Sequence, residues 1–513
     1  MTPDIPDKMR TIKLRSIFIL KGLLLSSNLL IAQLYFPDNN SVLSYNSSQL
    51  HQIGTDNFRA GNMFYSGQGR IENIDTLFRI KGARLLADDP EFNKRRPIYA
   101  PIGSLLRINI ITWLYDRYII NADYARINLT SWKNNIKYGW VWDDDRFAMN
   151  FVFHPTAGGS YYNCGRANGY SFYASTSFSI VGSLMWEYFG ENTRPSIDDL
   201  INTSGNSMFF GEIMYRLSSD ILDDRTTGAE RVFREIFAGI IDPVRGVNRL
   251  LQGKSFRITT KEIYQKEPVT MSLYAGEHLV NNGTEFLGGR SGQVLGVYLN
   301  YGDPFEVRSR KPFDVFRVQA EIGNGDSRKW LNILTGYGLL FGKTIKSGNM
   351  DMLIGAYQNY NYFDNRLFEI YSLSFGGGAM TRCTFTRNLN LQTNCYLGIV
   401  PFGGNSTQIG PQLTQVRDYN YVGGMETMLE AKFNIYDRVN IGFTGYYYWL
   451  HTYVGTSGNN YVGLLKPSVS FRIYRNLNMG FEQTLYLSDR FGSSSESGKV
   501  RNTEQRISLM YCF

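Results

Sequence analysis

Ionisable side chains gather between residues 154 and 216, in a stretch that is otherwise rich in aromatic residues. The candidates for chemistry are His154, Glu187, Glu191, Asp198, Glu212 and Arg216. Carboxylates beside histidine and arginine in an apolar setting can act as general acids and bases. The same side chains can instead form ion pairs that fix the packing of helices. Of these two interpretations, the packing role is preferred.

The residues that usually hold metals or cofactors lack the necessary spacing. The four histidines do not pair at ligand intervals, and the four cysteines form no CxxC motif. The run Asp143-Asp144-Asp145 lacks the glycine and the spaced glutamate of a calcium-binding loop. No phosphate-binding or dinucleotide-binding glycine motif occurs at a strand–helix junction. We therefore expect no metal and no cofactor.

The candidate residues are predicted to lie on helices. Apolar residues at helical intervals indicate an amphipathic helix over residues 103–120 and a longer one over 171–191. Ser196 is suited to cap the next helix, with Asp199 three residues later. A helix over 207–222 would place Glu212 and Arg216 one turn apart. Another over 230–241 is predicted to end before Pro243.

Several separate motifs accompany these helices. They are Trp140-Val141-Trp142-Asp143-Asp144-Asp145, His154-Pro155, Trp186-Glu187-Tyr188, Gly211-Glu212 and Pro243-Val244-Arg245-Gly246. This succession, over about residues 134–253, resembles the domain of unknown function 3943, a family of Gram-negative bacteria. The resemblance implies no activity. The chain departs from the family where a Gly-Gly pair usually precedes the Gly-Glu motif, because residues 206–210 read Asn-Ser-Met-Phe-Phe here.

From about residue 268 the hydrophobic period changes to two. In the last nine residues, Ile507, Leu509, Tyr511 and Phe513 alternate with mostly polar positions. This pattern is typical of a strand with one face in lipid and one in a polar lumen. A chain that ends in this way resembles bacterial outer-membrane β-barrels, and Leu509, Tyr511 and Phe513 would form the signal that the barrel assembly machinery reads.

Short polar connections alternate with long ones rich in Gly, Ser and Asn, as periplasmic turns alternate with extracellular loops. The spacing predicts a transmembrane antiparallel β-barrel of about twelve strands, with ten or fourteen as alternatives. Counting back from Phe513 places charges of both signs inside the barrel, where they can pair instead of lining an ion-selective channel. They are Glu426, Glu430, Lys432, Lys466, Arg472, Glu482, Glu504 and Arg506.

The N-terminus has the features of a targeting sequence. Arg10, Lys13 and Arg15 precede a mostly apolar stretch that ends near Ala32, which is the pattern of a secretory signal peptide. Five segments are therefore predicted: a signal peptide at 1–32, a polar and loosely structured N-terminus at 33–100, a mainly helical domain at 101–253, a connector at 254–267 and an outer-membrane barrel at 268–513. The expected location is the outer membrane of a Gram-negative bacterium, with the N-terminal domain in the periplasm or within the barrel.

Two functions stay open. The preferred one is a non-enzymatic outer-membrane barrel plugged or capped by its helical domain, acting in passage, surface binding or envelope architecture. The alternative is an envelope enzyme that modifies lipid or glycan with the carboxylates of the helical domain. Outer-membrane lipid and the assembly machinery are the expected partners. Nucleic acid is not, because the net charge of +8 over 513 residues includes no basic run.

Overall fold

The computed structural model describes residues 94–326, 329–365, 369–406, 419–492 and 498–513. The predicted signal peptide at 1–32 and nearly all of the polar segment at 33–100 lie outside the described residues. The chain divides into two compact units. We call the described parts of Ile71–Asp143 and Pro155–Lys266 the helical unit, and we call Asp144–His154 with Glu267–Phe513 the barrel unit.

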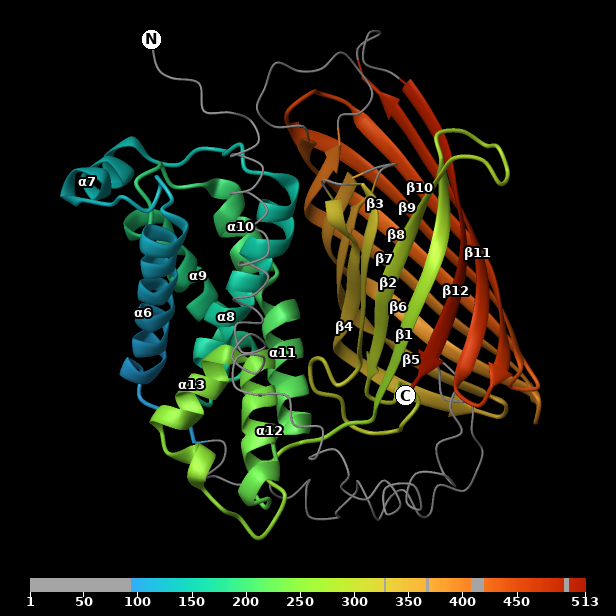
Figure 1. Ribbon diagram of the computed structural model, residues 1–513, viewed down its shortest axis with the longest axis horizontal. Helices are drawn as coiled ribbons and strands as arrows, with labels where there is room; N and C mark the ends of the chain where they lie inside the picture. The colour runs from blue at the N-terminus through green and yellow to red at the C-terminus, as the bar shows by residue number, and fades with distance from the viewer. Residues whose placement is uncertain (1–93, 327–328, 366–368, 407–418, 493–497) are drawn as a thin grey trace, which may run out of the picture. The chain divides into compact units, whose positions relative to one another are not determined.

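Helices form nearly all of the regular structure in the first part of the described chain (Figure 1). The α-helices are α6 (Tyr99–Leu114), α7 (Leu129–Tyr138), α8 (His154–Arg166), α9 (Phe172–Phe189), α10 (Ile197–Gly205), α11 (Ser207–Ile221), α12 (Gly228–Ile241) and α13 (Pro243–Leu251). Two π-helical segments, η1 (Tyr115–Ile120) and η2 (Met149–Phe153), and a 3-10 turn, η3 (Lys254–Phe256), complete them. Among the described residues, no helix is both long and apolar enough to cross a membrane.

Capping side chains account for where several of these helices begin. Ser171 Oγ accepts the Ala174 N–H at the start of α9, and Ser196 Oγ accepts the Asp199 N–H at the start of α10. Asp242 accepts the Arg245 N–H at the start of α13. Pro243 therefore occupies the first position of a new helix, where its missing N–H costs nothing. The prediction that α12 ends before Pro243 is correct, but the helix that follows it was not predicted.

Twelve antiparallel strands close into a barrel, which confirms the predicted fold class and strand number (Figure 1). The strands are β1 (Val269–Asn281), β2 (Arg290–Tyr301), β3 (Phe316–Asp326), β4 (Lys329–Ser347), β5 (Met350–Asp364), β6 (Glu369–Thr386), β7 (Leu389–Ser406), β8 (Tyr419–Ile435), β9 (Val439–Val454), β10 (Asn459–Tyr474), β11 (Leu477–Phe491) and β12 (Gly498–Cys512). Each strand pairs with its neighbours in sequence, and β1 pairs with β12 to close the wall.

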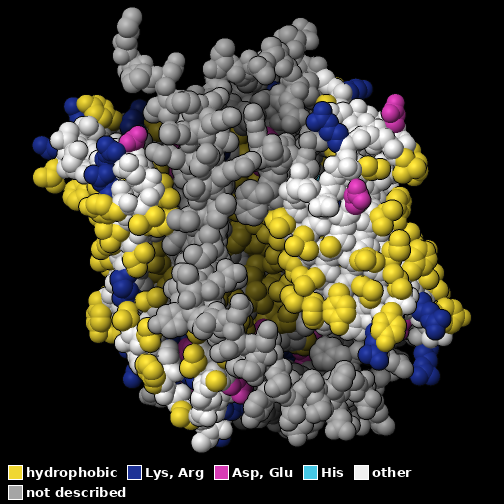
Figure 2. Space-filling model, viewed as in Figure 1, with side chains coloured by type: hydrophobic (Ala, Val, Ile, Leu, Met, Phe, Trp, Pro, Cys, Tyr) yellow, Lys and Arg dark blue, Asp and Glu magenta, His cyan; other side chains and the backbone are white. Residues whose placement is uncertain are grey.

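The two faces of the wall differ in chemistry. Ile399 is 63% exposed and Leu397 is 53% exposed on the outward face of β7, whereas the alternating inward positions include the buried Asn394 and Tyr396. Hydrophobic side chains gather over the outside of the barrel strands in Figure 2. An apolar exterior around an interior that carries polar side chains is the organisation of a transmembrane β-barrel.

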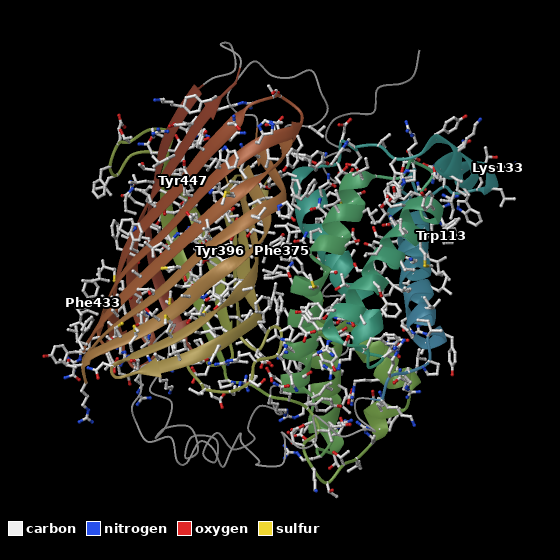
Figure 3. The ribbon with its side chains drawn as sticks, turned by 180° about the vertical axis from the view of Figure 1, so that it is seen from behind. Trp113, Lys133, Phe375, Tyr396, Phe433 and Tyr447 are labelled. Carbon is white, nitrogen blue, oxygen red and sulfur yellow. The ribbon has the colours of Figure 1, made fainter. Side chains whose placement is uncertain are left out.

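The two ends of the barrel also differ. Short turns at 348–349, 387–388, 436–438 and 475–476 lie at the same end as the start of β1 and the C-terminus. We call this the turn end and the opposite one the loop end. In Figure 3, Phe433 marks the turn end of the outward face, and Tyr447 lies closer to the loop end.

Candidate functional site

Glu212 on α11 is the centre of a buried ion-pair network in the helical unit. Arg166 on α8 donates two hydrogen bonds to its carboxylate, from Nε at 2.8 Å and from Nη2 at 3.0 Å. Arg216 donates another at 3.0 Å, and the Tyr162 hydroxyl a fourth at 2.9 Å. Burial alone would raise the pKa of Glu212, but Arg166 and Arg216 lower it to about 2. Glu212 is thus ionised at neutral pH and cannot serve as a proton donor there.

Gly211 allows this network to form. A Cβ atom at Gly211 would lie 2.8 Å from Cγ of Tyr162, closer than side chains normally approach. Glycine therefore lets Tyr162 lie against α11, where its hydroxyl reaches Glu212. The Gly-Glu motif has a packing reason at this position, which favours the structural interpretation of Glu212 and Arg216.

A second group of carboxylates lies where α9 meets α10. We call Asp143, Glu187, Asp198 and Asp199 the acidic cluster. The Ser196 N–H donates to Glu187 at 2.8 Å, and the Asp143 N–H donates to Asp198 at 3.2 Å. Burial, followed by the neighbouring carboxylates, raises the pKa of Glu187 and of Asp199. These two residues have the perturbed pKa values that the enzyme alternative requires.

The acidic cluster is also the group of side chains best suited to a cation among the described residues. Carboxylate oxygens of Asp143, Asp198 and Asp199 all lie within 4.8 Å of one another. Oxygen ligands of this kind suit magnesium or calcium. Acidic groups at such distances are common in proteins without a metal, so this geometry alone assigns no ion.

The remaining two candidates, Glu191 and His154, lie outside the Glu212 network and the acidic cluster. Glu191 accepts hydrogen bonds from Nε1 of Trp186 at 2.7 Å and from the Thr193 hydroxyl at 2.9 Å. His154 belongs to the barrel unit, with its Nε2 4.0 Å from a carboxylate oxygen of Asp145. The six candidates therefore divide among separate environments, of which only the acidic cluster combines several carboxylates.

Ion pairs cross the interior of the barrel. Arg317 on β3 donates to both carboxylate oxygens of Glu430 on β8, at 2.8 and 2.7 Å. Around the closed strand order, β3 and β8 are separated by five steps in one direction and seven in the other. These side chains therefore meet across the lumen and not along the wall.

A second interior network centres on Arg506 of β12. Its guanidinium donates to Glu321 on β3 at 2.6 Å and to Glu504 at 2.8 Å, and it lies 3.5 Å from Glu482 on β11. Glu504 also lies 2.8 Å from Nδ1 of His278 and accepts the Tyr486 hydroxyl at 2.6 Å. Charges of both signs are thus compensated inside the barrel.

The other predicted interior charges have different surroundings. Glu426 is buried and accepts the hydroxyls of Ser372 at 2.5 Å and Ser374 at 2.6 Å. Lys466 lies 4.0 Å from Glu482. Lys432 stands opposite Gln392 in the strand register, and Arg472 stands opposite Asn478.

The turn end of the lumen contains residues of the β2–β3 connection. Phe305 in this connection is 2% exposed and packs in one cluster with inward-facing residues of several strands. Tyr357 of β5, Met380 of β6, Tyr396 of β7 and Met428 of β8 belong to this cluster. This contribution could not be predicted from the sequence, because a single aromatic residue in a polar connection has no periodic pattern.

The segment Asp144–His154 packs on the outward face of the barrel near the loop end. Phe151 stacks on Tyr371 of β6, with ring centroids 4.2 Å apart. Nδ2 of Asn150 donates to the hydroxyls of Tyr419 and Tyr421 on β8, at 2.7 and 2.9 Å. We call this the aromatic docking surface; its barrel residues are Tyr360, Tyr362, Tyr371, Phe402, Tyr419 and Tyr421. It was not predicted from the sequence.

The geometry defines a closed, interior-filled barrel of the outer-membrane type. The family model described as Domain of unknown function (DUF3943) matches residues 139–244, which confirms the resemblance. The match covers most of the helical unit, the whole segment Asp144–His154 on the aromatic docking surface and none of the strands.

Solved structures with a similar fold are outer-membrane proteins. The NanC porin is 9% identical with a TM-score of 0.28, covering 47% of this chain and 98% of the porin. The outer membrane channel DcaP of Acinetobacter baumannii is 7% identical with a TM-score of 0.24, covering 48% and 96%. An outer membrane channel from Pseudomonas putida F1 is 9% identical with a TM-score of 0.28, covering 48% and 97%. A search of curated proteins finds no match.

Proposed function

We propose that this protein is a non-conducting outer-membrane anchor, whose barrel holds the helical unit in the envelope for an architectural or surface-binding role. The observation that carries the proposal is the Arg317–Glu430 ion pair across the lumen. A pore that passes hydrated solutes needs a continuous water-filled path. Arg317, Glu321, Glu426 and Arg506 are all buried, so the interior is occupied where such a path would run.

The location and partners belong to the same proposal. The apolar outward face supports a lipid bilayer as the surroundings of the barrel. Leu509, Tyr511 and Phe513 lie on or next to β12 with exposed side chains, which supports their role as the signal for the assembly machinery. A plugging or capping role of the helical unit stays a prediction, and the filled lumen does not require one.

Planar-bilayer recording tests the proposal. The purified full-length protein is expected to produce no steady conductance steps. A variant with both Arg317→Ala and Glu430→Ala removes the pair across the lumen and is expected to leak small ions. The matched control changes Arg382→Ala and Asp351→Ala, a pair at 2.5 Å between the neighbouring strands β5 and β6, and is expected to stay closed. Porin-like conductance of the unmodified protein would overturn the proposal.

The acidic cluster supports the enzyme alternative. Burial and the neighbouring carboxylates raise the pKa of Glu187 and of Asp199, which favours the protonated form that a general acid needs. An activity on envelope lipid or glycan would then be lost in Glu187→Gln and kept in Glu230→Gln, whose side chain is 59% exposed on α12. Equal loss in both variants would indicate damage to the helical unit and not to a catalytic group.

A further inference from the structure

On α12 and α13 of the helical unit, charged residues are buried while large apolar residues of the same helices are exposed. In α13, Arg245, Asn248 and Arg249 are buried, while Leu250 and Leu251 are exposed. In α12, Arg231 is 8% exposed whereas Phe233 and Phe237, on the same helix, are 51% and 53% exposed. Charged residues are rarely buried and large apolar ones are rarely exposed together in soluble proteins.

The buried charges are compensated by partners within the unit. Arg249 and Arg231 both reach Asp224 and Glu235, at 2.7 to 3.0 Å. Arg107 of α6 donates to Asn248 at 2.7 Å and to Ser104 at 2.9 Å. Ionisable residues of proteins in lipid show this arrangement, because they turn toward the interior of a helix bundle and pair there.

The longest apolar face belongs to α6 and the π-helical turn that continues it. Its exposed side chains include Ile110, Ile111 and Leu114, while Arg107 lies on the packed side. Tyr99 and Tyr118 stand at the two ends of this face, 74% and 67% exposed. Exposed charged residues follow beyond both ends, at 94–96 and at Asp123. Aromatic and charged residues at the ends of an apolar surface are typical of a boundary between lipid and water.

The three helices that carry these exposed residues pack together through α13. α13 contacts both α6 and α12, and a Cβ at Gly246 of α13 would lie only 2.7 Å from Cα of Gly239 in α12. Figure 2 shows hydrophobic side chains down the flank of the helical unit that carries α6. Charged residues gather elsewhere, for example on α7, whose Lys133 is labelled in Figure 3 together with Trp113 of α6.

We propose that this apolar surface, on α6, α12 and α13, contacts the acyl chains of the membrane that holds the barrel. The side chains that form this surface are exposed among the described residues. We choose lipid as the partner because the connection to the transmembrane barrel is short. The helical unit ends at Lys266 and β1 begins at Val269, so the chain holds the helical unit near the membrane. Contact is on one side of the helices only, since Leu105 of α6, Ala238 of α12 and Val244 of α13 are buried inside the helical unit. Anchoring by the barrel does not depend on this contact.

Photolabelling from the bilayer tests the contact without any substitution. The full-length protein is reconstituted in vesicles of Gram-negative outer-membrane lipid that contain a phospholipid with a diazirine on its acyl chain. After irradiation, labelled peptides are mapped by mass spectrometry. Peptides with Ile110 to Leu114 and with Phe233 to Phe237 are expected to be labelled as strongly as the outward Leu397 and Ile399 of the barrel. The inward Tyr446 and Tyr448 are the unlabelled control.

Hydroxyl-radical footprinting in the same vesicles provides the complementary measurement. The face of α6 is expected to be protected, and the exposed Leu129 and Ile136 of α7 are expected to be modified. Modification of α6 from water, without label from lipid, would overturn the proposal. Absence of both labels would mean that protein covers the surface, a second copy or another partner, and would overturn it as well. Neither result changes the expected conductance, so this inference and the proposed function can fail separately.

Discussion

The Arg317 guanidinium of β3 and the Glu430 carboxylate of β8 meet inside the barrel at 2.7 Å, and the Arg317 side chain is only 9% exposed. The Tyr337 ring lies beside the guanidinium, with its centroid 5.3 Å from Cζ. A charge that is buried in this way is stable only with its partner. The pair therefore both fills the lumen and makes the stability of the barrel depend on two strands that are distant around the wall.

Removal of one partner is expected to destabilise the barrel strongly. Glu430→Ala leaves Arg317 buried without compensation and should lower the free energy of unfolding by about 3–5 kcal/mol. The double variant Arg317→Met with Glu430→Leu should recover most of this loss, because apolar side chains of similar volume tolerate burial. Urea unfolding in detergent, followed by tryptophan fluorescence, measures both. If the double variant loses as much free energy of unfolding as the two single variants together, Arg317 and Glu430 do not stabilise the barrel as a pair.

The aromatic docking surface is expected to be sensitive to one added methyl group. A Cβ at Gly404 of β7 would overlap the Phe151 ring, so Gly404→Ala should displace the segment Asp144–His154 from the wall. Overpacking of this kind costs about 1–3 kcal/mol. Amide hydrogen exchange of residues 144–154 should accelerate in Gly404→Ala. Gly377→Ala is the matched control, because nothing lies within 4 Å of a Cβ at that position of β6.

The sequence predicted the parts of the fold that repeat. Alternation along strands such as β12 distinguishes the exposed Ile507 and Leu509 from the buried Arg506 and Ser508, since successive side chains point to opposite faces. The helix start at Ser196 was predicted for a similar reason, because a capping hydroxyl satisfies free N–H groups locally. Both signals depend on neighbours in sequence.

The aromatic docking surface could not be predicted in this way. Tyr371, Tyr419 and Tyr421 occupy outward positions, where tyrosine is also common at the membrane boundary of any barrel. Nothing in the local pattern distinguishes a tyrosine that meets lipid from one that Phe151 covers. The same limit applies to Arg317 and Glu430, because 113 residues separate the partners and the pattern assigns a face but no partner.

Glu212 is expected to be essential for the stability of the helical unit. Glu212→Gln leaves Arg166 and Arg216 without a buried carboxylate and should cost about 3–5 kcal/mol. Glu230→Gln is the control: its side chain is 59% exposed in a pair with Arg234, and pairs of this kind contribute well under about 1 kcal/mol. Thermal unfolding followed by circular dichroism of the helices compares the two.

The pH dependence of the Glu212 contribution has a definite sign. Its pKa in the folded protein is about 2, below the usual 4.5 of a glutamate. The stabilisation is therefore complete above about pH 4.5 and is lost as the pH falls toward 2. Acid should destabilise the unmodified protein more than Glu212→Gln in this range. Equal acid sensitivity of the two proteins would mean that Glu212 is not ionised in the folded state.

Asp242 is expected to act in the opposite direction. Burial raises its pKa to about 6 from the usual 3.8, although hydrogen bonds from the backbone at Arg245 and Val244 and the charge of Arg245 oppose the rise. The folded protein favours the neutral form of the Asp242 carboxyl. The contribution of Asp242 to the stability of the fold is therefore complete below about pH 3.8 and is lost as the pH rises through 6. The loss is on the order of 3 kcal/mol, at about 1.4 kcal/mol for each pKa unit.

Asp242→Asn isolates this contribution. Asparagine keeps a side-chain oxygen for the Arg245 N–H at the start of α13 and cannot ionise. The variant should melt at a higher temperature than the unmodified protein at pH 7 and lose this advantage at pH 4. Asp123→Asn, at a side chain that is 94% exposed, should leave the difference between the two pH values unchanged. If Asp242→Asn melts below the unmodified protein at pH 7, the carboxylate is ionised and compensated in the folded helical unit.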